Sequence, residues 1–115
     1  MIGRCFIMAC NGEYTMVITT CADKASAKQL ANIIVQQRLA ACAQLIPIES
    51  VYVWEGEVCS EDETILLIKT KTALFDKLSA AIIENHSYEV PEIIKLPITG
   101  GHPDYLSWID ETIGN

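Results

Sequence analysis

The chain has 115 residues, half of them apolar, a size and composition that suit one compact domain with a substantial core. Its formal net charge of −7 argues against nucleic-acid binding, because affinity for a phosphate backbone comes mainly from clustered Lys and Arg. The most apolar segment, residues 64–68, is only strand-length, so we expect a soluble protein that does not span a membrane.

Residues 1–13 are interpreted as an N-terminal extension, either disordered or adding an edge strand, and residues 14–115 as the domain. The apolar stretch of the extension is too brief for a signal peptide. The cysteines have no Cys-x-x-Cys pair or matching His spacing, so we expect no structural zinc. We expect reduced thiols in a cytoplasm, most of them buried as small apolar side chains. They are Cys5, Cys10, Cys21, Cys42 and Cys59.

The first predicted strand covers residues 15–20, which are rich in β-branched side chains. Asp23 then offers an N-cap for a helix over 24–39, whose apolar residues recur with helical spacing. A second apolar run over 40–48 predicts a strand, in which Pro47 requires a bulge, a bend or an edge position because proline cannot donate to the ladder.

The next segment predicts a β-hairpin between two long strands. Residues 50–54 and the stretch from Val58 onward flank Glu55-Gly56, where the glycine permits a positive φ. The stretch TILLIKT, residues 64–70, is apolar at nearly every position. We therefore expect both faces of this strand to be covered, one by helices and the other by a second layer.

The last third of the chain predicts a helix, a strand and a short helix. Thr72 is expected to cap a helix over 73–85. Residues 92–98 predict a strand, and Pro97 implies an edge or a strand end. The final short helix follows Asp104.

The predicted order is β-α-β-β-α-β with a small helix appended, which is the ferredoxin-like arrangement of an α+β sandwich. Right-handed crossovers place both main helices on one face of an antiparallel sheet. The other face would expose the apolar residues of the 64–70 strand. We therefore expect self-association through this face or the sheet edges, with closed symmetry.

Several segments, in order and spacing, resemble the CutA divalent-cation tolerance family over about residues 15–113. They are LAACAQLIP (39–47), YVWEG (52–56), ILLIKT (65–70), HSYEVPEI (86–93), LPI (96–98) and YLSW (105–108). The resemblance implies a ferredoxin-like subunit in a tight homotrimer, assembled by strand pairing between subunits. It also implies an association with copper or another divalent cation, which we do not expect folding to require.

The resemblance also suggests where a metal would bind. Family members reported to bind copper use a Cys at the end of the first strand and two consecutive His after the second helix. These positions fall here on Thr19, Asn85 and His86, so only the last is a ligand type. Cys21 lies two residues after Thr19 and offers a displaced thiolate. We therefore expect a weak metal site formed by Cys21 and His86.

His86 is the main candidate for function, since it follows a helix C-terminus and lies near Tyr88, Glu89 and Glu92 in the sequence. Either glutamate is placed to accept a hydrogen bond that orients the ring for a metal. The alternative is an exposed capping histidine beside solvated acids. His102, in a glycine-rich turn, is interpreted as a surface loop residue.

Acidic residues gather around the predicted hairpin, where they either attract cations weakly or only keep the surface soluble. They are Glu55, Glu57, Glu61, Asp62 and Glu63. Four large rings are expected to fill core or subunit contacts rather than to stack on a ligand. They are Tyr52, Trp54, Tyr105 and Trp108.

No nucleophile elbow, P-loop or dinucleotide-binding pattern is present, so we expect no enzyme activity. The first hypothesis for function is a cytoplasmic homotrimer that binds metal ions weakly and contributes to metal tolerance. The alternative is a trimeric sensor or interaction module resembling PII signalling proteins, with a small ligand in the clefts between subunits. A third hypothesis is a scaffold for a protein partner, whose identity the sequence leaves unknown.

Overall fold

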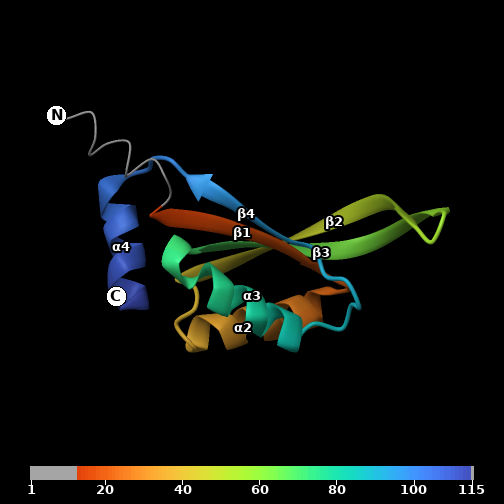
Figure 1. Cartoon of the computed structure of the whole chain (residues 1–115), viewed down its shortest axis with the longest axis horizontal. Helices are drawn as coiled ribbons and strands as arrows, with labels where there is room; N and C mark the ends of the chain where they lie inside the picture. Colours follow the sequence, from red (N-terminus) through yellow and green to blue (C-terminus); the bar gives the residue numbers. More distant parts are fainter. Residues whose placement is uncertain (1–12, 115) are drawn as a thin grey trace.

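The computed structural model describes residues 13–114, which form a four-stranded sheet and a layer of helices (Figure 1). The strands are β1 (Tyr14–Cys21), β2 (Cys42–Trp54), β3 (Glu57–Lys71) and β4 (Ile93–Ile98). The helices are α2 (Lys24–Gln36), α3 (Phe75–Glu84) and α4 (Pro103–Ile113), with a 3-10 turn η1 (Thr72–Leu74) before α3. The prediction for the extension falls almost wholly outside the described residues, as do Cys5 and Cys10.

The strand order is β2-β3-β1-β4, and all neighbouring strands are antiparallel. Helices α2 and α3 lie side by side beneath one face of this sheet (Figure 1). This arrangement confirms the predicted α+β fold of the ferredoxin-like type. Pro47 lies in β2 and Pro97 in β4, which are the two edge strands, so both prolines take the positions that their missing N–H requires. Within the described part of the chain, no helix is long and apolar enough to cross a membrane.

Helix α2 begins at the residue that the sequence indicates. The Asp23 carboxylate accepts a hydrogen bond from the backbone N–H of Ser26 at 2.8 Å, and the Asp23 N–H points back to the Ser26 hydroxyl at 3.4 Å. This reciprocal capping box satisfies two backbone donors that have no partner inside the helix. The hydrogen bonds from Ser26 also lower the pKa of Asp23.

The expected helix cap at Thr72 is wrong. Residues 72–74 form a 3-10 turn, and α3 begins only at Phe75, without a side-chain cap. The Thr72 hydroxyl lies 2.7 Å from the Thr15 hydroxyl of β1, so it is already hydrogen-bonded to the neighbouring strand. A cap that looks free in the sequence is therefore used in a tertiary contact.

The β2–β3 hairpin is longer than the predicted one, because β2 runs without interruption from Cys42 to Trp54. Its turn, Glu55-Gly56, has positive φ at both residues, 52° and 80°, as tight hairpin turns require. The last residue of β1 pairs with Thr64, so residues 48–63 extend beyond β1 as a two-stranded ribbon (Figure 1). A two-stranded ribbon is only marginally stable in water by itself.

The core lies between the sheet and the two helices. Leu66 and Ile68 of β3 are fully buried against α2 and α3, because alternate residues of a strand point to the same face. The other fully buried large apolar residues of this cluster are Val17, Leu30, Ile34, Leu78 and Ile82.

Three cysteines lie in the described residues, and all are free thiols. Cys21 is buried, but Cys42 and Cys59 are only half-buried. The expectation that most cysteines are buried is therefore wrong for these two. Cys59 lies in the ribbon that extends beyond β1, and Cys42 lies at the start of β2, where the Tyr105 hydroxyl of α4 is 3.6 Å from its sulfur.

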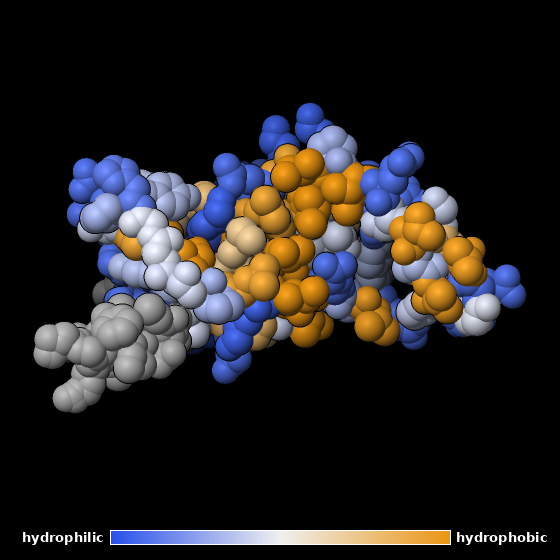
Figure 2. Space-filling view, turned by 90° about the horizontal axis from the view of Figure 1, so that it is seen from above, coloured by the Kyte–Doolittle hydropathy of each residue, from blue (hydrophilic) through white to orange (hydrophobic). Residues whose placement is uncertain are grey.

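No helix among residues 13–114 covers the opposite face of the sheet. Ile18, Ile65 and Leu67 lie at its centre and are only half-buried, and Figure 2 shows the broad apolar patch on this face. Ile46, Ile94 and Leu96 flank them, with exposed fractions of 44%, 47% and 40%. We call these six residues the open sheet face. Among the described residues of one chain, then, only one face of the 64–70 strand is covered, and the second layer that the sequence predicts would have to come from another copy of the chain.

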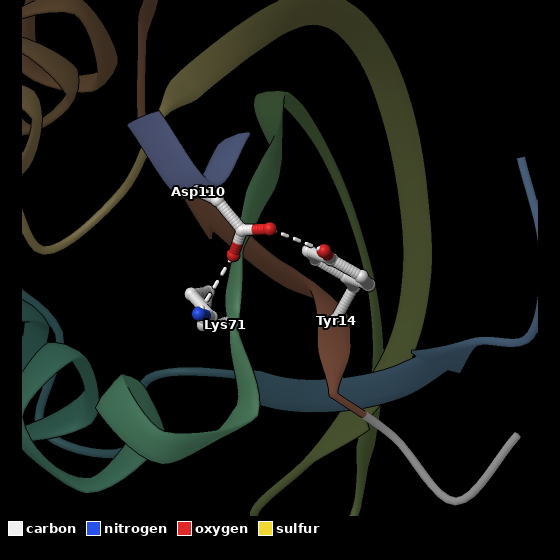
Figure 3. Close-up of polar contacts among 3 residues, drawn as sticks. All are labelled: Tyr14, Lys71 and Asp110. Carbon is white, nitrogen blue, oxygen red and sulfur yellow. Dashed lines mark hydrogen bonds and ion pairs between the residues drawn. The ribbon is translucent and has the colours of Figure 1, made fainter. Parts of the chain in front are cut away.

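Helix α4 is held against the sheet by an ionic contact as well as by apolar packing (Figure 3). The Tyr14 hydroxyl donates to Asp110 Oδ2 at 2.6 Å, and Lys71 Nζ lies 2.7 Å from Asp110 Oδ1. Lys71 first and Tyr14 second lower the pKa of Asp110, while the bond to Asp110 raises the pKa of Tyr14 to about 12. One carboxylate therefore joins α4 to the ends of β1 and β3.

We expect this contact to make stability depend on pH in a defined direction. The pKa of Asp110 is lower in the folded chain, so the contact stabilises the fold above the unfolded value, about 4, and this contribution disappears as the pH falls through the folded pKa. Asp110→Asn should therefore lower the thermal midpoint at pH 7 and flatten its decline between pH 5 and pH 2. Asp62→Asn, on the exposed part of β3, is the control. An unchanged acid profile for Asp110→Asn would contradict this assignment.

Candidate functional site

The structure brings the two predicted metal ligands together. Cys21 is the last residue of β1, and His86 follows directly after the C-terminal residues of α3. The Cys21 sulfur lies 3.9 Å from His86 Nε2, although the two residues are 65 positions apart. Their proximity follows from the fold, because α3 runs beneath the sheet and ends below the end of β1 (Figure 1).

Both ring nitrogens of His86 already have backbone partners. Nε2 lies 2.6 Å from the carbonyl oxygen of Thr20, to which it donates, and Nδ1 accepts from the backbone N–H of Tyr88 at 3.0 Å. Of the two interpretations of these acids, the solvated one is therefore correct, since Glu89 and Glu92 are both exposed and neither orients the ring. The backbone carbonyl of Thr20 is the acceptor that takes the place of a carboxylate, and the Tyr88 N–H holds the other ring nitrogen.

The Cys21 thiol is held in its protonated form. Burial first, and the nearby negative charges of Asp23 and Glu63 second, together raise the pKa of Cys21 to about 11. Nucleophilic cysteines need a lowered pKa, because the thiolate is the reactive species. At neutral pH this side chain is thus a weakly polar group rather than a nucleophile.

Cys21 and His86 line a small cavity of about 180 Å³. Its remaining polar lining consists of hydroxyl and amide groups from Ser26, Gln29, Asn85 and Ser87, and none of the lining side chains is an acid, a lysine or an arginine. Asn85, at one of the family's ligand positions, donates its side-chain amide to the Ala81 carbonyl at 2.8 Å.

Thr19, at another of these family positions, is fully buried, and its hydroxyl has no hydrogen-bond partner among the described residues. It does not line the cavity.

The donor set fits a weakly held soft cation. Thiolate and imidazole are the ligands that soft metals prefer, and metal–sulfur and metal–nitrogen bonds of about 2.3 and 2.0 Å can span the 3.9 Å between these atoms. Binding requires Cys21 to lose its proton and His86 to give up its bond to Thr20. Within residues 13–114, no three His, Cys, Asp or Glu side chains lie close enough to hold one metal ion, so the site lacks a full ligand set.

A larger hollow of about 670 Å³ lies on the open side of the sheet, between the protruding ribbon and the segment 88–92. Glu63 and Tyr88 meet there, with the Tyr88 hydroxyl donating to the Glu63 carboxylate at 2.6 Å. The sequence pattern indicates only that Glu63 is one of several surface charges around the hairpin, and it does not predict the contact with Tyr88. The same-face spacing of Tyr52 with Trp54 and of Glu61 with Glu63 is the signal that could have indicated part of this groove.

The remaining candidates lie away from both hollows. His102 occupies the N-cap position of α4, with 73% of its side chain exposed, 3.8 Å from Asp104, which agrees with a surface residue. The rings of Tyr105 and Trp108 pack against each other with their centroids 5.5 Å apart, and each residue is 40% exposed. Within one chain these rings therefore lie at the surface and not in the core.

The ferredoxin-like sheet with one apolar face left open by the described helices, and a thiol and an imidazole brought together at the end of β1, define a small α+β protein of the ferredoxin-like class. The family described as CutA1 divalent ion tolerance protein matches residues 15–112, and this chain belongs to that family.

Relatives and a solved structure support the assignment. The chain is 48% identical to the chloroplastic protein CutA of Arabidopsis thaliana, over 87% of this chain but only 56% of that protein, so it spans little more than half of this relative. It is 41% identical to the divalent-cation tolerance protein CutA of Thermus thermophilus, over 86% of this chain and 97% of that one. The periplasmic divalent cation tolerance protein CutA of Archaeoglobus fulgidus has a similar structure, with a TM-score of 0.85 and 31% identity over 87% of this chain and 98% of that one.

These relatives overturn the cytoplasmic assignment made from the sequence. The Arabidopsis protein is chloroplastic and the Archaeoglobus protein periplasmic, so family members work in different compartments. The odd number of cysteines in the sequence bears on disulfide formation and does not identify a cellular compartment.

Proposed function

We propose that this chain acts as a homotrimer in the response to divalent and soft metal cations, and that Cys21 and His86 hold copper or a similar ion weakly. The observation that carries this proposal is the 3.9 Å approach of the Cys21 sulfur to His86 Nε2 beside a neutral cavity. Family membership supports the tolerance role, because the Thermus relative is a divalent-cation tolerance protein.

The trimeric assembly is supported by two surfaces that one chain leaves uncovered. The open sheet face exposes apolar residues from all four strands, and contiguous patches of this kind mark interaction sites. The protruding ribbon carries Val51, Val53 and Val58, which are 71%, 67% and 75% exposed. A neighbouring copy of the chain would cover both surfaces, and closed symmetry would leave neither exposed.

In this proposal the role of the metal is regulatory or protective, and the protein is not an enzyme. The bound cation would contribute a positive charge held by two soft donors. The protonated Cys21 thiol supplies no nucleophile, which agrees with a binding role. The apolar core between the sheet and the helices forms from side chains alone, so we do not expect folding to need a metal.

The test is a Cu(I) titration of the purified protein under reducing conditions, against a competing chelator. We expect Cys21→Ser to weaken binding by at least about tenfold, a loss of about 1.4 kcal/mol, because the soft donor is removed. Cys59→Ser is the matched control, since it removes a thiol from the half-buried part of β3 without touching the cavity. Equal copper affinity in Cys21→Ser and the unaltered protein would rule out this site.

A gain-of-binding variant makes the test independent of any loss of folding. Asn85 lines the same cavity as Cys21 and His86, so Asn85→His should add an imidazole donor and tighten copper binding by about tenfold or more. No gain from this variant, with the mass of the assembly unchanged, would count against copper at this position.

A further inference from the structure

The cavity that Cys21 and His86 line lies on the helical side of the sheet. Cys21 is 4% exposed and belongs to the core cluster between β1 and the helices, because alternate residues of the strand point to that side. The rest of the lining comes from α2 and from residues 85–87, which follow α3. None of the lining residues belongs to the open sheet face or to the ribbon, which are the surfaces that the proposed homotrimer covers.

The cavity offers two soft donors, the Cys21 sulfur and the His86 imidazole. Within residues 13–114, no further His, Cys, Asp or Glu completes a group of three ligands around them. The other polar groups of the lining are neutral amides and hydroxyls. Zinc sites are almost always tetrahedral, and magnesium or calcium takes roughly six oxygen ligands or more. Cu(I) and Ag(I), by contrast, prefer soft donors and form stable complexes with only two of them.

The separation of the two donor atoms also favours an ion with few ligands. With metal–sulfur and metal–nitrogen bonds of about 2.3 and 2.0 Å, a tetrahedral ion holds these atoms about 3.5 Å apart and a linear one about 4.3 Å. The distance from Cys21 Sγ to His86 Nε2 is 3.9 Å, which corresponds to an angle of about 130° at the metal. This angle is wider than the tetrahedral one.

The charge of the cavity favours a monovalent ion as well. A metal-bound thiolate carries one negative charge and imidazole carries none, so a monovalent cation makes the complex neutral, whereas a divalent cation leaves a positive charge that is costly in a buried site. Asp23 and Glu63 are near enough for their charge to act on Cys21, but neither lines the cavity. Asp23 accepts from the backbone N–H of Ser26, and Glu63 accepts from the Tyr88 hydroxyl.

We propose that the Cys21–His86 pair selects monovalent soft cations, Cu(I) or Ag(I), over the divalent cations after which the family is named. The pair does so because it supplies only two donors and one negative charge. The number of donors, their separation and the otherwise neutral lining support this selectivity. The inference rests on the proposed metal function and narrows the class of ion that the site takes.

Ag⁺ and Cd²⁺ are matched probes, because both are soft ions with a filled d shell and they differ by one unit of charge. The test uses the full assembled chain with Cys21 as the single thiol. The cysteines replaced by serine are Cys5, Cys10, Cys42 and Cys59. Calorimetric titration in chloride-free buffer measures both affinities. We expect Ag⁺ to bind at least about a hundredfold more tightly than Cd²⁺.

The ¹⁵N shift of the His86 imidazole gives a second measurement. It reports coordination of the ring in the single-thiol chain and in the unaltered one, so the ranking of the two ions does not depend on the serine substitutions. We expect Ag⁺ to shift this signal at concentrations where Cd²⁺ does not.

A pair of variants tests the role of charge. Gln29 lines the cavity, so Gln29→Glu adds a carboxylate to it and should narrow the preference for Ag⁺ by about tenfold or more. Gln36→Glu adds the same charge to the exposed surface of α2, about 10.5 Å further along the helix and outside the cavity. This control should leave the preference unchanged within about twofold.

The possible failures are distinguishable. Equal affinities for the two ions, or tighter binding of Cd²⁺, each lost in Cys21→Ser, would overturn the selectivity and leave the metal site in place. An unchanged preference in Gln29→Glu would overturn its basis in charge. Binding of neither ion, or Ag⁺ binding that survives Cys21→Ser, would overturn the proposed metal site together with this inference.

Discussion

Ile82→Ala is expected to lower the free energy of unfolding by about 2 to 5 kcal/mol, whereas Ile83→Ala, one residue further on, should be close to neutral. Ile82 is fully buried between α3 and the sheet, and its truncation leaves a cavity that the close-packed core cannot refill. Ile83 is 58% exposed, and Ala has a higher helix propensity than Ile, so this change removes little buried surface.

The pair is measured by urea unfolding at one fixed protomer concentration, because the stability of an assembly depends on concentration. The two variants delete the same atoms from the same helix, so a difference between them reports burial and not chemistry. Equal losses of stability would mean that Ile83 is covered in the assembled protein and that α3 also forms a subunit contact.

Leu67→Asp is expected to abolish the assembly. Leu67 lies at the centre of the open sheet face, directly across from Ile18 of β1. A carboxylate buried there without a partner would cost several kcal/mol in each subunit. Light scattering or native mass spectrometry should then show the loss of the trimer. Because the open face and the ribbon would return to water, we also expect the cooperative unfolding transition to weaken or disappear.

The matched control is Ile83→Glu, which adds the same charge to an exposed position on the helical layer and should keep the mass of the assembly. Ile94→Asp, at the edge of the open face, is a second probe in case Leu67→Asp does not fold at all. Trimers of unchanged mass in both Leu67→Asp and Ile94→Asp would contradict assembly through this face. We expect that the unaltered chain does not stay folded as a monomer. Folded monomers of this chain at nanomolar concentration would contradict that expectation.

Local signals in the sequence were sufficient where a residue acts on its own neighbours. Asp23 caps α2 through Ser26, three residues away, and Glu55-Gly56 turns the hairpin because both residues can take a positive φ. Pro47 and Pro97 lie in edge strands for the equally local reason that each lacks an N–H. The nearly continuous apolar run over residues 64–70 also indicated that one strand has two apolar faces, of which one packs against the helices and the other lies in the open sheet face.

The same local signals failed where a partner comes from elsewhere in the chain. Thr72 has the right residue type for a cap, but its hydroxyl lies against Thr15. Glu89 and Glu92 are close to His86 in sequence, yet backbone groups of Thr20 and Tyr88 bind its ring. Nothing in the local sequence distinguishes a free hydroxyl or ring nitrogen from one that a tertiary contact already satisfies.

The sequence by itself therefore determined the elements and their order, because helix caps, turn residues and apolar periods act over a few residues. The resemblance of its ordered motifs indicated the family. It also named Cys21 and His86, but only the tertiary structure placed their side chains 3.9 Å apart and raised the pKa of the thiol by burying it. The groove was likewise decided by folding, since its walls come from the ribbon and from a segment some thirty residues away. Distances and burial between such segments depend on how layers pack, and no local pattern encodes that packing.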